Sequence, residues 1–178
     1  MRARAFVFCA ILAGGCAEPN GDHGDAKTPG ELLGTYALSG RIARDTCGAE
    51  LLGAPDPWSF QVKLSRFQRD LYWLNGREAI VGDIAADGSA FQFSTRVDVN
   101  ITPAGAGKVG CVVSRFDTAD GVLALHGDEV TAVKTKLTFE YKPKANSECL
   151  EIIGVPGGLQ QLPCTLSYNL SGGLAGGS

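Results

Sequence analysis

The residues that could carry chemistry in this chain are few and scattered. The body of the chain has one histidine, His126, which is followed by glycine in a segment typical of a hairpin end. No G-x-S-x-G segment, phosphate loop, dinucleotide fingerprint or cluster of metal ligands accompanies it. Carboxylates such as Asp83, Asp98 and Glu140 fall on the polar faces of predicted strands, where hydration is their ordinary role. The sequence therefore predicts a protein that is not an enzyme and uses no cofactor or metal, with a two-carboxylate hydrolase as the catalytic alternative.

The first thirty residues are typical of an exported protein. Arg2 and Arg4 give a positive start, and residues 5–13 form an apolar run of nine residues. A transmembrane helix needs about 20 such residues, so residues 1–15 are interpreted as a signal peptide. Residues 17–30 contain no large apolar side chain and are rich in Pro, Gly and Asp, which predicts a flexible tether.

The end of the predicted signal peptide carries a recognisable motif. Leu12-Ala13-Gly14-Gly15-Cys16 places small residues directly before a cysteine and resembles the lipobox of bacterial lipoproteins, with Ala13 where that family usually has Leu. The resemblance implies that Cys16 is diacylated and begins the mature chain, so that residues 16–30 link a membrane lipid to the folded body. Because the next residue is not Asp, it further implies the outer membrane. An ordinary secretory signal with unmodified Cys16 is the alternative.

Charge argues against nucleic acid as a partner. The chain has 16 Lys and Arg residues, and loss of Arg2 and Arg4 leaves 14 against 19 acidic residues, a net charge of −5. No basic cluster remains for phosphate binding. A charged fraction of 20% and 24 glycines are typical of an extracellular β protein.

Four cysteines remain in the body of the chain. They are Cys47, Cys111, Cys149 and Cys164. An even number in an exported chain predicts two disulfides, for which three pairings are possible. Cys149 with Cys164 is favoured because it closes a local loop, which leaves Cys47 with Cys111. A zinc site is disfavoured, because no C-x-x-C pair is present and no histidine lies beside the cysteines.

Apolar residues at every second position predict an all-β domain over residues 31–172, followed by a disordered tail at 173–178. The predicted strands are 34–44, 58–65, 70–75, 77–85, 89–101, 110–118, 122–126, 130–142 and 163–171. No comparable stretch shows helical spacing.

Turn chemistry predicts how these strands connect. Asn75-Gly76, Asp87-Gly88 and Asp120-Gly121 favour tight hairpins, and hence a single antiparallel meander of eight or nine strands. Because each strand has one apolar face, the sheet must close on itself or pack on a second layer. Closure removes exposed edges, so an up-and-down barrel is favoured over a sandwich.

Two groups of residues are candidates for contact with a ligand or partner. The segment between Cys149 and Cys164 is apolar for a loop and includes Ile152, Ile153 and Val155, which predicts either a plug over the core, the favoured role, or a contact surface. Four aromatic residues could line a ligand cavity, although core packing is their default role. These are Trp58, Trp73, Phe91 and Phe93.

Gly34-Thr35-Tyr36 resembles the Gly-x-Trp that begins the first strand of lipocalins and avidins, which are ligand-holding up-and-down barrels. With Tyr in place of Trp, and without the late arginine of lipocalins in the last strand, the resemblance implies architecture rather than function.

The leading functional hypothesis is a non-catalytic cell-envelope lipoprotein that holds a small apolar ligand or contacts another envelope component. A structural or interaction domain with a filled core is the alternative. An enclosed apolar void above about 300 Å³ would favour the ligand, and a packed interior would favour interaction.

Overall fold

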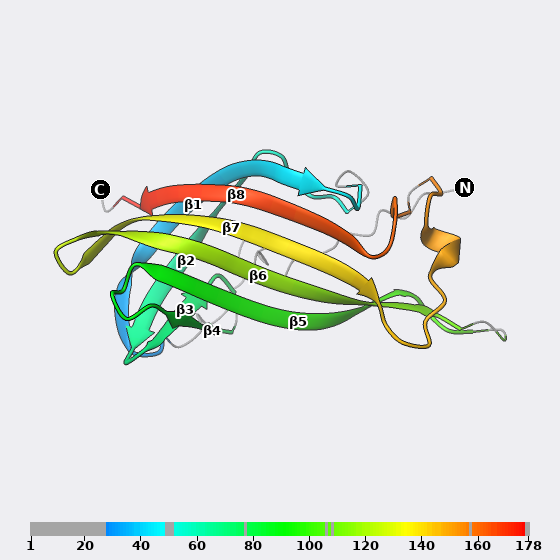
Figure 1. Ribbon diagram of the computed structural model, residues 1–178, viewed down its shortest axis with the longest axis horizontal. Helices are drawn as coiled ribbons and strands as arrows, with labels where there is room; N and C mark the ends of the chain where they lie inside the picture. The colour runs from blue at the N-terminus through cyan, green and yellow to red at the C-terminus, as the bar shows by residue number, and fades with distance from the viewer. Residues whose placement is uncertain are drawn as a thin grey trace, which may run out of the picture.

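The period-two alternation of the sequence becomes a closed antiparallel barrel in the computed structural model (Figure 1). Residues 28–48, 52–76, 78–105, 107, 109–156 and 158–176 are described. The elements are β1 (Glu31–Asp45), β2 (Trp58–Phe67), β3 (Asp70–Leu74), β4 (Ile80–Ile84), β5 (Ala90–Thr102), β6 (Cys111–His126), β7 (Glu129–Pro143), the short 3-10 helix η1 (Leu150–Ile152) and β8 (Cys164–Leu174). Each strand pairs with its sequence neighbours, and β8 pairs with β1. The predicted up-and-down barrel is confirmed.

Some of the predictions made from the sequence lie outside the described residues. The signal peptide, Cys16 and the tether as far as residue 27 are among them. At the other end, β8 continues to Leu174, two residues past the predicted domain boundary at 172. Within the part of the chain that is described, no helix has the length and apolarity needed to cross a membrane.

One predicted hairpin is wrong. The segments 110–118 and 122–126 form a single strand, β6, and Asp120-Gly121 lies in its middle, paired with β5 and β7. A Cβ atom on Gly121 would lie 2.3 Å from the Phe91 ring and 2.5 Å from the carbonyl oxygen of Lys134. This glycine therefore allows close packing against Phe91 rather than a turn. The hairpin of β6 and β7 turns six residues later at Gly127, whose φ is +62°.

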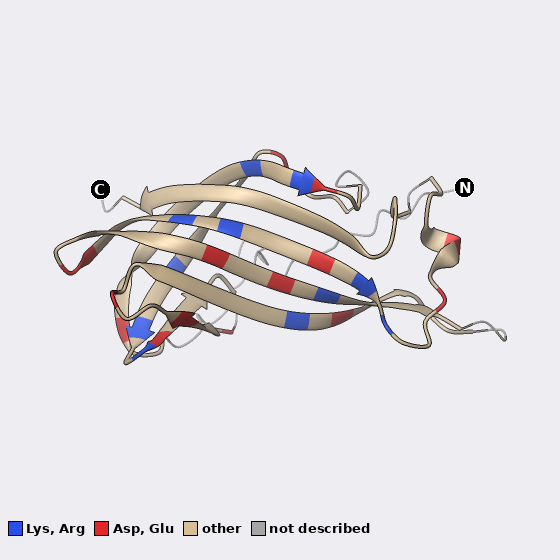
Figure 2. Ribbon diagram, in the orientation of Figure 1, with Lys and Arg blue, Asp and Glu red and all other residues tan. Residues whose placement is uncertain are grey.

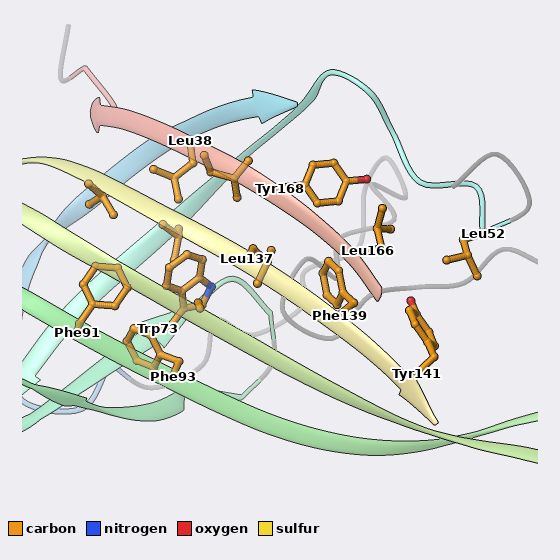
Figure 3. Close-up of a cluster of buried hydrophobic side chains, with 14 of the residues drawn as sticks. Leu38, Leu52, Trp73, Phe91, Phe93, Leu137, Phe139, Tyr141, Leu166 and Tyr168 are labelled. Carbon is orange, nitrogen blue, oxygen red and sulfur yellow. The ribbon is translucent and has the colours of Figure 1, made fainter. Parts of the chain in front are cut away.

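A continuous chain of seven aromatic rings fills the interior of the barrel. Neighbouring ring centroids are 4.8 to 6.5 Å apart along it. In order the rings are those of Phe91, Phe93, Trp73, Phe60, Trp58, Tyr168 and Phe139. Figure 3 shows five of these side chains directed inward from different strands. Aromatic pairs at such distances add about 0.5 to 1.5 kcal/mol each beyond the area that they bury.

All four cysteines of the domain form disulfides, but the preferred pairing is wrong. The bonds join Cys47 to Cys164 and Cys111 to Cys149, with Cα separations of 5.0 and 4.8 Å. Neither the expected Cys149–Cys164 bond nor the expected Cys47–Cys111 bond is present.

Barrel closure is the physical reason for the observed pairing. Because β1 is bonded to β8, Asp45 is paired with Leu166, and two residues beyond them Cys47 meets Cys164. β6 and β7 are likewise neighbours, and the loop after β7 returns Cys149 to the start of β6. Both bonds therefore join adjacent strands at one end of the barrel, here called the disulfide end.

We expect the two disulfides to differ in their contribution to stability. The Cys47–Cys164 bond spans 117 residues and the Cys111–Cys149 bond spans 38. In the chain-entropy model the replacement of each pair by serine lowers the free energy of unfolding by about 5 and about 4 kcal/mol, respectively. Urea denaturation of the two double variants measures this difference, and a larger loss for the second variant would contradict the model.

Candidate ligand-binding site

The aromatic residues proposed to line a ligand cavity lie in the packed interior. Trp73, Phe91 and Phe93 are buried and contact one another, and Trp58 is half-buried against Phe60. These rings pack against each other and thereby fill the barrel. The structure therefore places them in the core rather than around an open space.

The apolar loop between β7 and β8 has a buried side and an exposed side. Leu159 is buried in the core cluster at the disulfide end, and Ile152 and Ile153 are half-buried. By contrast, Leu150 is 85% exposed and Val155 is also exposed. The backbone N–H of residue 160 donates to the carbonyl oxygen of residue 47 at 3.0 Å, which holds the loop over this end. One side of the loop is thus a plug, and the other faces solvent.

A pocket of about 400 Å³ lies at the opposite end of the barrel, here called the mouth. It is open to solvent and is lined by the start of β1, the hairpin of β2 and β3, the turn between β4 and β5, and the hairpin of β6 and β7. Its apolar lining is formed by Leu33, Ile84, Leu123, Leu125 and Val130. Its charged lining residues are Arg66, Arg69, Asp87 and Asp128. The mouth pocket therefore combines an apolar surface with charges of both signs.

The position of Arg66 in the mouth follows from strand alternation. Val62 and Leu64 are buried inward positions of β2, so Arg66 is the next inward position, directly across from buried Leu71. At that point the barrel ends, and Arg66 is exposed to solvent. Sequence reasoning missed Arg66, although its even spacing from residues 62 and 64 predicts that it points to the inside of the barrel.

Tyr36 separates the mouth pocket from the packed interior. Its side chain is fully buried. Its hydroxyl donates to the carbonyl oxygen of Val130 at 2.9 Å, and the carbonyl oxygen of Leu33 is a second acceptor at 3.1 Å. Burial raises the pKa of Tyr36, so the hydroxyl stays protonated and able to donate. Gly34 has φ +150°, and a Cβ there would lie 2.6 Å from Leu174 Cδ2 and 3.0 Å from the Tyr36 hydroxyl. The Gly-Thr-Tyr sequence thus closes the barrel just beneath the pocket.

A buried ion pair lies deeper in the barrel and was also missed. The side chains of Arg115 and Asp117 are 2% and 0% exposed. Arg115 donates from Nε to Oδ1 at 2.7 Å and from Nη2 to Oδ2 at 2.8 Å, and its guanidinium lies 5.5 Å from the Phe139 ring centroid. Arg115 and Asp117 lie at even spacing from Val113 and Ala119, which are buried on the same face of β6. This spacing could have identified both residues as inward-facing from the sequence.

The electrostatics of this pair favour a structural role. Burial raises the pKa of Asp117, and Arg115 partly offsets that effect. Both carboxylate oxygens accept a hydrogen bond from Arg115, which fixes the position of the carboxylate in the core. The pKa of Tyr141 is also raised by burial.

The carboxylates singled out from the sequence lie on the outer surface of the barrel. Asp98 accepts hydrogen bonds from Ser114 Oγ at 2.7 Å and from Lys144 Nζ at 2.6 Å, and these bonds lower its pKa to about 2. Glu140 forms an ion pair with Lys142 at 2.9 Å, and Asp83 is exposed on β4. Across the described ranges, no three His, Cys, Asp or Glu side chains are grouped as metal ligands. His126 is exposed at the end of β6, as expected for a hairpin residue.

Comparison with known proteins identifies no family. No family model matches the chain, and neither a curated protein nor a solved structure is significantly similar to it. The likeness to lipocalins and avidins therefore extends only to the eight-stranded closed barrel.

We expect removal of one partner of the buried ion pair to be far more costly than removal of both. Arg115→Met or Asp117→Asn leaves an uncompensated buried group and lowers the free energy of unfolding by about 3 to 5 kcal/mol. The double variant Arg115→Met/Asp117→Leu stays within about 1 kcal/mol of the parent. Lys142→Met, which breaks an exposed pair, is the control and costs at most about 1 kcal/mol. Urea denaturation measures all four proteins, and equal losses in single and double variants would refute a paired role.

We expect Asp98 to make stability depend on pH in the acid range. Its pKa is about 2 in the folded protein, against an ordinary value of 3.8, so its contribution is present above pH 4 and is lost as pH falls toward 2. Asp98→Asn should lower the thermal midpoint at pH 7 and flatten its decline between pH 4 and 2. Asp83→Asn, which removes a carboxylate at an exposed position of β4, is the control.

Proposed function

We propose that this protein is a non-catalytic, extracytoplasmic binding protein that holds a small amphipathic ligand in the mouth pocket. The mouth pocket is the observation that carries the proposal, because its volume of about 400 Å³ lies in the range of small-molecule sites. The two disulfides indicate an extracytoplasmic protein.

The filled interior leaves no space for a ligand inside the barrel and, by the criterion given above, favours an interaction role, so the ligand proposal depends on the mouth pocket alone. The aromatic rings and the Arg115–Asp117 pair occupy the space that a ligand inside the barrel would need. Above Tyr36, apolar side chains, two arginines and two aspartates line one pocket. A ligand with an apolar body and an anionic group meets the apolar side chains and the arginines, since guanidinium groups bind carboxylates and phosphates through paired hydrogen bonds.

Membrane attachment through Cys16 is the second part of the proposal. The lipobox resemblance supports it, and so do the disulfides, because lipoproteins of this kind fold outside the cytoplasm. The acyl chains of a lipidated cysteine give stable anchoring.

Native mass spectrometry of the protein purified from its own host tests both parts. We expect the acyl mass on Cys16 and a retained small ligand. Arg66→Gln/Arg69→Gln should lower ligand occupancy about tenfold or more, because charged hydrogen bonds contribute about 1.5 to 3 kcal/mol each.

The matched control removes two positive charges at the disulfide end. Arg41→Gln/Arg44→Gln changes residues at the end of β1 and should retain the ligand fully. Equal loss in both variants, or no ligand in the parent protein, would contradict the proposed site.

A protein-contact role at the disulfide end is the second candidate. Leu150 is 85% exposed on a loop held by a disulfide, and an exposed apolar residue in a fixed loop is typical of a contact site. A defined envelope complex that Leu150→Ser dissociates, together with an empty mouth pocket, would favour this candidate over ligand binding.

A further inference from the structure

Four large apolar side chains are exposed around the mouth. Leu32, Phe67 and Leu174 are each 54% exposed, and Leu125 is 42% exposed. They come from the start of β1, the end of β2, the end of β8 and the end of β6, and these strand ends lie at the same end of the barrel (Figure 1). Isolated exposed apolar residues are common, but four of them at one end of a barrel indicate a contact surface.

Glycines allow the backbone to come close to three of these side chains. A Cβ atom on Gly30 would lie 2.8 Å from Phe67 Cβ, and one on Gly34 would lie 2.6 Å from Leu174 Cδ2. A Cβ atom on Gly88 would lie 3.9 Å from Leu125 Cδ1. Phe67, Leu174 and Leu125 therefore lie close to the backbone at the mouth.

The charges at the mouth are of both signs. Arg66 and Arg69 lie at the hairpin of β2 and β3, whereas Asp87 and Asp128 lie at the two other turns of the pocket. Figure 2 shows acidic and basic residues interspersed at this end. A headgroup that carries a phosphate and an ammonium matches both sets, whereas a purely anionic surface would repel the aspartates.

The chain enters the barrel at the mouth. Residues 28–30 lead into β1 there, and 15 residues from Cys16 to Gly30 separate the proposed lipid from the first strand. A flexible chain of 15 residues has an end-to-end distance of about 20 Å. The disulfide end is farther away by the length of β7, about 50 Å of strand. An anchored protein therefore presents its mouth to the membrane.

We infer that the mouth end docks on a zwitterionic phospholipid surface, with Leu32, Phe67, Leu125 and Leu174 in the boundary between headgroups and acyl chains and the mouth pocket open to lipid. This inference rests on the proposed function for the anchor at Cys16, and it names a lipid surface as the partner of the mouth. The disulfide end, with Leu150, then faces away from the bilayer.

Vesicle flotation of the mature chain with Cys16→Ser tests this docking without the covalent lipid. Vesicles of phosphatidylcholine and phosphatidylethanolamine, at about 1 mM accessible lipid and physiological salt, should carry the protein to the top of the gradient. Phe67→Ser/Leu125→Ser should lower the bound fraction about tenfold, because both side chains lose their apolar contact with lipid.

The matched control removes two exposed apolar side chains from the other end. Leu150→Ser/Val155→Ser should float as the parent does. Near-ultraviolet circular dichroism of both variants establishes that the barrel is intact, and a second mouth variant, Leu32→Ser, is used if the first does not fold. An equal loss of binding in the control, or stronger binding to pure phosphatidylglycerol vesicles, would overturn the proposal.

Failure of this inference and failure of the proposed function are distinguishable. If the host-purified protein carries an acyl group and a ligand while the Cys16→Ser chain does not float, the docking inference falls and the proposed function stands. If the Cys16→Ser chain floats through Phe67 and Leu125 while the host-purified protein carries neither acyl group nor ligand, the proposed function falls and the docking stands.

Discussion

Hydrogen bonding between β1 and β8 is the constraint on which the rest of the structure depends. It converts a meander with two open edges into a closed barrel and leaves no strand edge along that seam. It also defines an inside, so that every second residue of each long strand must fill the same space. The pairing of Cys47 with Cys164 is a direct consequence, because only closure brings the first and last strands together. The seam is thus fixed twice, by backbone hydrogen bonds along its length and by a covalent bond at one end.

The filling of that interior decides where binding is possible. The aromatic chain and the Arg115–Asp117 pair occupy the barrel up to Tyr36, whose hydroxyl bonds across to β7. A ligand inside the barrel would have to displace buried rings, each of which contributes to stability. Binding at the mouth would displace no buried ring, because Arg66 is already exposed and Leu33, Leu123 and Val130 already line the pocket with apolar surface. The architecture resembles ligand-holding barrels, but the site that we propose lies at the rim of this barrel rather than within it.

Sequence reasoning predicted the elements well and the long-range relations poorly. The alternation from Trp58 to Leu64 depends only on neighbouring residues, so it identifies β2 and its inward face directly. Asp120-Gly121 gave a false turn because a glycine that admits the Phe91 ring and a glycine that turns the chain look the same in sequence. The disulfide pairing could not be derived, because it depends on which strands become neighbours at closure. Arg66, Arg115 and Asp117 could have been found, since each lies at even spacing from buried residues of its own strand.

The two ends of the barrel are stabilised by different kinds of interaction, and this difference bears on function. At the disulfide end, two covalent bonds, the plug at Leu159 and the backbone bond from residue 160 to residue 47 hold the loops in place. At the mouth, which is the opposite end, the hydrogen bonds of the Tyr36 hydroxyl and the packing of short turns hold the chain. Because the proposed anchor also joins the chain at the mouth, the end next to the lipid under that proposal is the one held by hydrogen bonds and packing, and the cross-linked end is the far one.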